Sequence, residues 1–261
     1  MKTLTKINPS YGNLSDYIAG LPSVFEKEGD TIYRGRNELK RFTAPDGTDI
    51  VVKHYAHLPA FRRVIYSFVA KSKARRAYDY GMRFSDLGYN TPTPVAYIEI
   101  YERGLLSDAY FVSLHNDAEP LFKPLVEAER FDSDLADDVA ILMASMHAAG
   151  MLHGDPNLSN ILYKRQDDGR VSLTLIDTNR SHFGKYLSLR RCLKNLMRVS
   201  HRRDLMRHIV GRYASLRGLD PVKTVDRVFA MLERFERNRE RRHRIKKFFK
   251  KRLAQQLLRV V

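Results

Sequence analysis

The chain has 261 residues, a length that allows a sizeable core in one large domain or in two lobes. Its 43% apolar residues indicate a globular protein rather than a disordered one, and its single cysteine, Cys192, excludes an internal disulfide. No stretch approaches the roughly 20 apolar residues of a membrane span, and the first residues lack the apolar core of a signal peptide. We therefore expect a protein that is kept in the cytoplasm.

The net charge of +16 is unevenly distributed. Residues 190–261 hold 23 basic and 6 acidic residues, whereas residues 1–189 hold 23 basic and 24 acidic ones. A basic segment of this size favours an anionic partner, which is a nucleic acid, an anionic lipid surface or a phosphorylated glycolipid. The alternative is a helix that only exposes its charges to water.

The first half of the chain predicts strands around one long helix. Residues 31–55 read as strands on either side of the turn Pro45-Asp46-Gly47, and the last of them, "DIVVKHY", carries Lys53. Residues 59–87 read as one helix that ends at Gly88. Two further strands are expected in "NTPTPVAYIEIYERG" and "DAYFVSLHND".

The second half begins with the clearest helix, residues 132–149. Its apolar residues recur at helical spacing, Asp132 or Ser133 is the expected N-cap, and Gly150 ends it. A polar loop, a hairpin around "QDDG" and basic helices follow, with Asp220 as N-cap of the last one. This order predicts an α+β, two-lobed protein-kinase-like fold, with a small β-rich N-terminal lobe (residues 1–116) and a helical C-terminal lobe (residues 117–261).

The loop "HGDPNLSN" has the kinase spacing H-x-D-x-x-x-x-N. In such a loop Asp155 accepts or orients the proton of an attacking hydroxyl, Asn160 holds a metal ion between phosphates, and His153 braces the loop. Asp177 ends the apolar run "LTLI", where a kinase places its second metal ligand. The pattern predicts transfer of a phosphoryl group from ATP with Mg²⁺.

Three more residues are expected to act on the nucleotide. Lys53 matches the strand lysine that neutralises the α- and β-phosphates, and Gly35 is the only glycine of the segment that would cover them. Kinases pair the lysine with a helix Glu, but no Glu occurs between Glu38 and Glu99. Asp79 is the expected substitute, although Ala77 matches the position of the missing Glu. These departures leave a pseudokinase as an alternative.

Beyond the general kinase pattern, the sequence resembles the bacterial lipopolysaccharide core kinases, the Kdo and heptose kinases. The resemblance covers roughly residues 30–190, in the segments "YRGRNELK", "GYNTPTPVAYIE", "HGDPNLSNILY" and "LIDTNR", the last in place of the protein-kinase "DFG" segment. It implies a kinase that phosphorylates a Kdo or heptose hydroxyl of the lipopolysaccharide inner core, as a peripheral protein at the cytoplasmic face of the inner membrane.

Two rival functions stay open. A protein kinase of an atypical bacterial or RIO-like type shares the loop, but it would carry a long activation segment, whereas the residues after Asp177 become basic and helical soon. A non-enzymatic nucleic-acid binder would use the basic tail, but it leaves the catalytic spacing unexplained. From Pro221 onward, apolar residues recur at helical spacing, so we expect them to pack on the C-terminal lobe; they are Val225, Val228, Phe229, Leu232 and Phe235. Beyond them, we expect the basic tail around Ile245, Phe248, Phe249 and Leu253 to lie on an anionic membrane, with no nucleic acid as partner. His147 is expected at the helix surface or in packing, and Cys192 is not expected to be a nucleophile. The sequence does not predict the oligomeric state.

Overall fold

The computed structural model describes residues 1–56 and 58–257. Within it the chain forms two compact units, each discontinuous in sequence. The first contains Met1–Glu127 and Leu152–Phe183, and the second contains Ala128–Met151 and Gly184–Val261. The loop that contains His153, Asp155 and Asn160 and the hairpin after it thus belong to the same compact unit as the N-terminal strands, whereas the lobe boundary expected from the sequence lies at residue 116.

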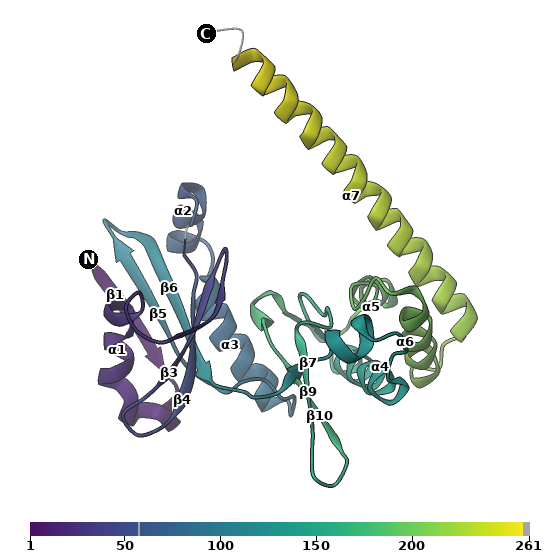
Figure 1. The fold of residues 1–261 in the computed structure, drawn as a ribbon, viewed down its shortest axis with the longest axis horizontal. Helices are drawn as coiled ribbons and strands as arrows, with labels where there is room; N and C mark the ends of the chain where they lie inside the picture. The colour runs from purple at the N-terminus through teal and green to yellow at the C-terminus, as the bar shows by residue number, and fades with distance from the viewer. Residues whose placement is uncertain (57, 258–261) are drawn as a thin grey trace. The chain divides into compact units, whose positions relative to one another are not determined.

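The first unit is built on a six-stranded antiparallel sheet (Figure 1). Its strand order is β1-β5-β6-β4-β3-β2. The strands expected from the sequence are confirmed, but the first strand of the chain was not expected. The bounds are β1 (Lys2–Ile7), β2 (Asp30–Arg34), β3 (Glu38–Thr43), β4 (Asp49–His54), β5 (Pro94–Glu102) and β6 (Leu105–Leu114).

Alternation along β4 assigns its residues to two faces of the sheet. Ile50 and Val52 are fully buried in a core that also contains Ile18 and Leu21 of helix α1 (Ser15–Val24), so α1 covers this face. Because successive side chains of a strand point to opposite faces, Val51 and Lys53 lie on the other face. The β-branched core residues thereby fix the register that presents Lys53 away from α1.

The expected helix 59–87 is in fact two helices, α2 (Ala60–Phe68) and α3 (Lys73–Asp86). The break follows from a local cap: the Ser72 side chain accepts a hydrogen bond from the backbone N–H of Arg75 at 3.0 Å and starts a new helix. Gly88 ends α3 with a positive φ of 79°, as expected. Helix α3 packs on the face opposite α1 through Ala74 and Tyr78.

Short elements complete the first unit. The expected hairpin is confirmed as β9 (Ile161–Arg165) and β10 (Val171–Leu175), in antiparallel register. Strand β7 pairs with β9. The remaining elements are η1 (Pro9–Leu14), β7 (Glu119–Pro120), the π-helical turn η2 (Lys123–Glu127), the 3₁₀ turn η3 (Thr178–Arg180) and β11 (His182–Phe183), while β8 (Met151–Leu152) lies at the junction of the two units.

The second unit is helical, with α4 (Ser133–Ala148), α5 (Leu189–Leu196), α6 (Arg203–Leu216) and α7 (Pro221–Leu257). Asp132 caps α4, because its side chain accepts hydrogen bonds from the backbone N–H groups of Asp134 and Leu135. Val139 and Met143 of α4 and Ile209 of α6 are fully buried where the two helices pack. The expected N-cap Asp220 is confirmed by its hydrogen bond from the N–H of Lys223 at 3.0 Å.

Among the described side chains of helix α7, the buried ones lie in its first turns. Val228 and Leu232 are buried, but Phe235, which was expected in the same packed stripe, is 39% exposed. From Arg237 to Ile245 every side chain is exposed. The side chains of Phe248, Phe249 and Leu253, which the expected membrane face includes, lie outside the described ones. Within residues 1–56 and 58–257 no helix is long and apolar enough to span a membrane.

Candidate active site

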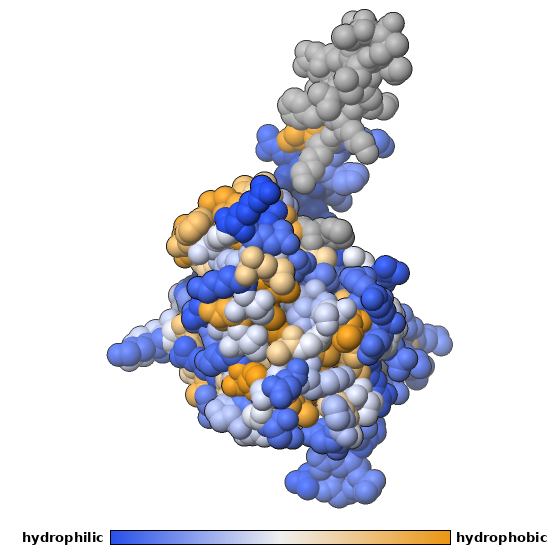
Figure 2. Space-filling view, turned by 90° about the vertical axis from the view of Figure 1, so that its left-hand side faces the viewer, coloured by the Kyte–Doolittle hydropathy of each residue, from blue (hydrophilic) through white to orange (hydrophobic). Residues whose placement is uncertain are grey.

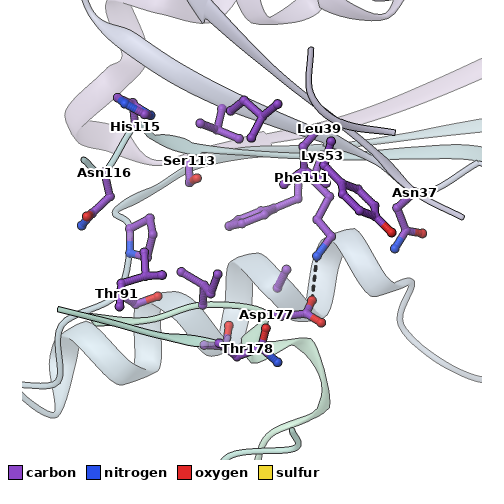
Figure 3. Close-up of a pocket in the computed structure, with 18 of the residues that line it drawn as sticks. Asn37, Leu39, Lys53, Thr91, Phe111, Ser113, His115, Asn116, Asp177 and Thr178 are labelled. Atoms are coloured by element: carbon purple, nitrogen blue, oxygen red, sulfur yellow. Dashed lines mark hydrogen bonds and ion pairs between the residues drawn. The ribbon is translucent and has the colours of Figure 1, made fainter. Parts of the chain in front are cut away.

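A cavity of about 670 Å³ opens within the first unit (Figure 3). Its volume is in the range of small-molecule and cofactor sites. Leu39, Val51 and Phe111 contribute apolar side chains to its lining, which suits a flat aromatic ring. Lys53, which pairs with Leu39 and Phe111 in the sheet, points toward Asp177, and these two residues suit charged groups. The cavity therefore has the polarity that a nucleotide requires.

The two charged residues form an ion pair. The ammonium of Lys53 donates to Oδ1 of Asp177 at 2.7 Å, although the residues are 124 positions apart in sequence. Both side chains are largely buried, with 18% and 30% of their surface exposed. The ammonium of Lys53 also lies 5.5 Å from the ring centroid of Tyr55. The six-stranded sheet carries Lys53, and the segment directly after β10 carries Asp177. The fold thus brings together two residues that the sequence analysis assigned to one site.

Asp177 has an unusual backbone conformation and stays ionised. Its φ of 57° and ψ of 42° lie in the left-handed region, which Asp tolerates better than most residues and which is often found at functional sites. Burial alone would raise the pKa of Asp177, but the charge and hydrogen bond of Lys53, with smaller effects of Arg180 and His153, keep this pKa below its ordinary value. The carboxylate is therefore charged at neutral pH.

Asn179 is a site residue that the sequence reasoning missed. Its amide donates to Oδ1 of Asp177 at 2.6 Å and to the hydroxyl of Tyr55 at 3.4 Å, and the side chain is 97% inaccessible to solvent. Tyr55 itself is fully buried, and burial followed by the charge of Asp177 raises its pKa. Asn179 thus holds the carboxylate of Asp177 in place. The signal was the "DTN" segment, in which this Asn stands where "DFG" has its glycine.

His153 braces the catalytic loop, as expected. The imidazole is fully buried, and this burial lowers its pKa, so that it stays neutral. Its Nδ1 accepts a hydrogen bond from the backbone N–H of Asp155 at 3.2 Å, and its Nε2–H donates to the carbonyl of Ile176 at 3.0 Å. The histidine therefore ties the loop of Asp155 to the residue just before Asp177.

Gly154 is required by close packing inside the same loop. A Cβ at this position would overlap the backbone and Cβ of Arg180, so only glycine lets the two segments approach. Asn160 closes the loop from the other end, because its amide Nδ2 donates to the carbonyl of Asp155 at 3.0 Å. These contacts fix the "HGD" segment against the segment that carries Asp177.

Asp177 and Asn160 form a donor set that fits Mg²⁺. Both side chains line the cavity, and carboxylate and amide oxygens are hard ligands of the kind that this ion prefers. Mg²⁺ commonly uses one or two protein carboxylates together with phosphate oxygens. The described part of the chain has no group of three or more His, Cys, Asp or Glu residues that could hold a metal ion.

The expected pairing of Asp79 with Lys53 is wrong. Asp79 forms an ion pair with Lys71 at 2.6 Å, while Lys53 is paired with Asp177. The residue of α3 that lines the cavity is Ala77, which carries no charge. The helical spacing explains the error, because residues two positions apart on a helix point in different directions. Asp79 is therefore no candidate for the nucleotide site.

Gly35 lies in the turn between β2 and β3. Its N–H donates to the carbonyl of Asn37 at 3.1 Å, and a Cβ here would collide with the ring of Tyr33. Tyr33 and Asn37 line the cavity. The turn therefore borders the cavity, and covering of phosphates by Gly35 itself stays a prediction.

Comparison with known proteins gives one family and one fold. The family model described as "Lipopolysaccharide kinase (Kdo/WaaP) family" matches residues 61–215, more than half of the chain. No sequence among the curated proteins compared is significantly similar.

Two solved structures resemble the chain. "WaaP in complex with acyl carrier protein" matches with a TM-score of 0.60 and 19% identity, covering 90% of this chain and 99% of that one. The Rio2 kinase–ADP/Mg²⁺–phosphoaspartate complex from Chaetomium thermophilum matches with a TM-score of 0.45 and 17% identity, over 86% of this chain and 77% of that one. The kinase-like fold expected from the sequence, with a β-sheet N-terminal region and a helical C-terminal region, is confirmed.

Proposed function

Because the chain belongs to the Kdo/WaaP lipopolysaccharide kinase family and is therefore a phosphotransferase, we propose that it transfers the γ-phosphate of ATP to a sugar hydroxyl of the lipopolysaccharide inner core. The acceptor sugar is Kdo or heptose. The observation that carries the proposal is the Lys53–Asp177 pair in a cavity that Asn160 also lines. This arrangement offers one cation and two oxygen ligands next to the apolar residues of the cavity.

The residues of this chain have separate tasks in the proposed reaction. The apolar wall binds the adenine ring, and the Lys53 ammonium binds the α- and β-phosphates. Asp177 and Asn160 hold Mg²⁺, which when bound neutralises the charge of the triphosphate. Asp155 accepts or orients the proton of the sugar hydroxyl, while His153 and Asn179 keep Asp155 and Asp177 in position without touching the substrate.

The chain after Asp177 supports a small acceptor over a peptide. The 3₁₀ turn η3 and strand β11 occupy only a few residues, and α5 already begins at Leu189. A protein kinase uses a longer activation segment here to hold its peptide. We therefore keep protein phosphorylation as the rival function and do not propose nucleic-acid binding.

We place the enzyme at the cytoplasmic face of the inner membrane, where both ATP and a lipid-linked sugar would be accessible. The exposed basic part of α7 supports this location, because clusters of Lys and Arg bind anionic lipid surfaces.

The decisive experiment is mass spectrometry of lipid A–core from cells with the gene, without it, and with the gene carrying Asp155→Asn. We expect the core to lose one phosphate when the gene is absent, and the variant to fail to restore it, because a positioned base contributes about 10²–10⁴-fold in rate. Purified Asp155→Asn protein should still bind ATP. An unchanged core in all three strains would refute the proposal, and phosphate on a co-purified protein would support the rival.

A further inference from the structure

Helix α2 exposes its apolar face to solvent. Phe61, Val64, Ile65 and Phe68, with Val69 at its C-cap, recur at the spacing of a single helix face. All five are exposed, Phe68 by 73% and Val69 by 81%. No residue of α2 is buried. In an ordinary surface helix such a stripe faces the core. In α2 the apolar face points to solvent instead.

Hydrogen bonds with β6 hold α2 with its apolar face toward solvent. The guanidinium Nε of Arg63 donates to the carbonyl of Leu106 at 3.0 Å. The backbone N–H of Leu106 donates to the hydroxyl of Ser67 at 2.8 Å, and this hydroxyl donates to the carbonyl of Arg63 at 2.6 Å. The polar side of α2 is thus attached to the protein, and the apolar side is left without a partner among the described residues.

The surroundings of α2 are strongly cationic. Residues 60–78 contain six Arg or Lys residues and no acidic residue. Around Lys73 of α3 lie Arg36, Arg62, Arg76 and Arg180, whereas Arg63 and Lys71 of the same stretch pair with Glu102 and Asp79. Burial and the neighbouring positive charges lower the pKa of Lys73 to about 8. A cation cluster under such repulsion is relieved by anions.

We propose that α2 lies in the surface of an anionic phospholipid bilayer, with its apolar stripe among the acyl chains and the surrounding cations at the phosphate headgroups. An exposed stripe with aromatic residues, flanked by Arg and Lys and lacking acids, is the pattern of an interfacial helix. Figure 2 shows hydrophobic residues next to hydrophilic ones near the top of the body, at the height of α2 in Figure 1. A soluble protein partner would need to match both the apolar stripe and the cations.

The location of α2 connects this surface with the cavity. In sequence α2 lies between β4, which carries Lys53, and α3, which carries Ala77, and both residues line the cavity. The cation cluster around Lys73 joins Arg62 of α2 to Arg36 and Arg180, which are close in sequence to the cavity residues Asn37 and Asp177, so docking of α2 would bring these cations toward the lipid surface. This consequence, unlike the insertion of α2 itself, depends on the proposed function, in which the acceptor is lipid-linked.

The chain has no tryptophan, so Phe68→Trp introduces a single fluorescent reporter on α2. The full-length variant is mixed with vesicles of phosphatidylglycerol and phosphatidylethanolamine, with or without bromine on the acyl chains. We expect a blue shift of the emission and strong quenching by the brominated chains. The matched reporter Val222→Trp, at a residue of α7 that is 71% exposed, should show neither effect.

A paired set of variants tests the stripe without a reporter. Phe61→Ser with Phe68→Ser should lower vesicle binding at least several-fold, whereas Leu87→Ser with Ile141→Ser, also at exposed apolar residues, should not. All four side chains are exposed, so both variants should keep the wild-type melting temperature.

Three outcomes would overturn the proposal. If the protein binds vesicles while the tryptophan at residue 68 keeps a water-like emission, other parts of the chain bind lipid and α2 does not. If the double α2 variant binds as tightly as wild type, the stripe has no role. If the blue shift appears without lipid as the protein concentration rises, a second copy covers α2. None of these readouts needs turnover, so they separate this proposal from failure of the proposed function.

Discussion

Asp177 combines a protein contact with a predicted ligand role. One carboxylate oxygen already accepts hydrogen bonds from Lys53 and Asn179. Because the lowered pKa keeps the group ionised at neutral pH, the carboxylate is ready to bind a divalent cation without first losing a proton.

We predict that Asp177→Ala removes the Mg²⁺ dependence of ATP binding. Without the carboxylate, Asn160 would be the only side-chain oxygen ligand of the expected set, and a single amide is a poor site for a hard cation. Isothermal titration with ATP, with and without Mg²⁺, measures the effect, and Asp79→Ala serves as control because Asp79 contacts Lys71 instead. A variant whose ATP affinity still rises with Mg²⁺ as in wild type would remove Asp177 from the metal site.

Mutation of Lys73 tests whether repulsion within the cation cluster lowers the stability of the fold. Lys73→Met keeps most of the apolar stem and removes a charge that repels its four arginine neighbours, so the free energy of unfolding should rise by about 0.5–1 kcal/mol, the scale of exposed charge pairs. Urea unfolding measures it, with the exposed Lys27→Met as control. A loss of stability would mean that the cluster is not repulsive.

Spacing made the catalytic residues predictable, but not their supporting contacts. The positions of His153, Asp155 and Asn160 follow from one short loop, so the sequence alone was sufficient to propose them. The "DTN" segment signals the contact of Asn179 with Asp177, but no local pattern reveals that Asn179 also contacts Tyr55 or that Gly154 packs against Arg180 across the fold. The error at Asp79 has the same origin, since the direction of a helix side chain depends on the exact helix start.

At the scale of elements, α4, α5 and α6 share a buried polar contact. The Nδ1 of His147 accepts a hydrogen bond from the hydroxyl of Tyr213 at 2.9 Å, and its Nε2–H donates to Oδ1 of Asn195 at 3.1 Å. The sequence assigned His147 to helix surface or packing, and the structure shows packing. Burial lowers the pKa of this histidine to about 4, so it is neutral in the folded protein.

This contact predicts a loss of stability in acid. The ordinary histidine pKa is about 6.5, so between that pH and about 4 the unfolded chain binds a proton that folded His147 refuses. Stability should therefore fall as the pH decreases through this window, by about 3 kcal/mol at most. His147→Gln should flatten this part of the curve in urea unfolding at several pH values. An equal slope in variant and wild type would show that other groups, such as His153, cause it.

The break between α2 and α3 shows why element boundaries were harder to predict than elements. Residues 59–87 hold no Gly or Pro between Pro59 and Gly81, so periodicity alone favoured one continuous helix. In the structure, the backbone N–H of Arg75 donates to the side chain of Ser72, and this cap begins a second helix at that point. A serine inside a polar stretch is a weak signal, because Ser occurs both at caps and on helix surfaces.

At the scale of the whole molecule, the two proposed membrane contacts are of different kinds. Helix α2 offers an apolar stripe in the first unit, whereas α7 offers charge. Residues 241–261 contain nine basic residues and no acidic one. Each Lys or Arg near an anionic lipid surface contributes about 1 kcal/mol, and salt weakens this attraction.

We predict that truncation before Arg241 separates catalysis from membrane binding. Val228 and Leu232 anchor α7 ahead of the cut, and the described side chains from Arg237 to Ile245 are exposed, so the shortened chain should keep the wild-type melting temperature. Phosphate transfer to a short soluble sugar acceptor should persist, whereas transfer to lipid-embedded acceptor and binding to anionic vesicles should both fall. The remaining vesicle binding should depend less on salt, because α2 would hold it mainly through apolar contacts. A truncated chain that unfolds, or a full-length chain that ignores anionic vesicles at low salt, would show that the basic end of α7 is structural.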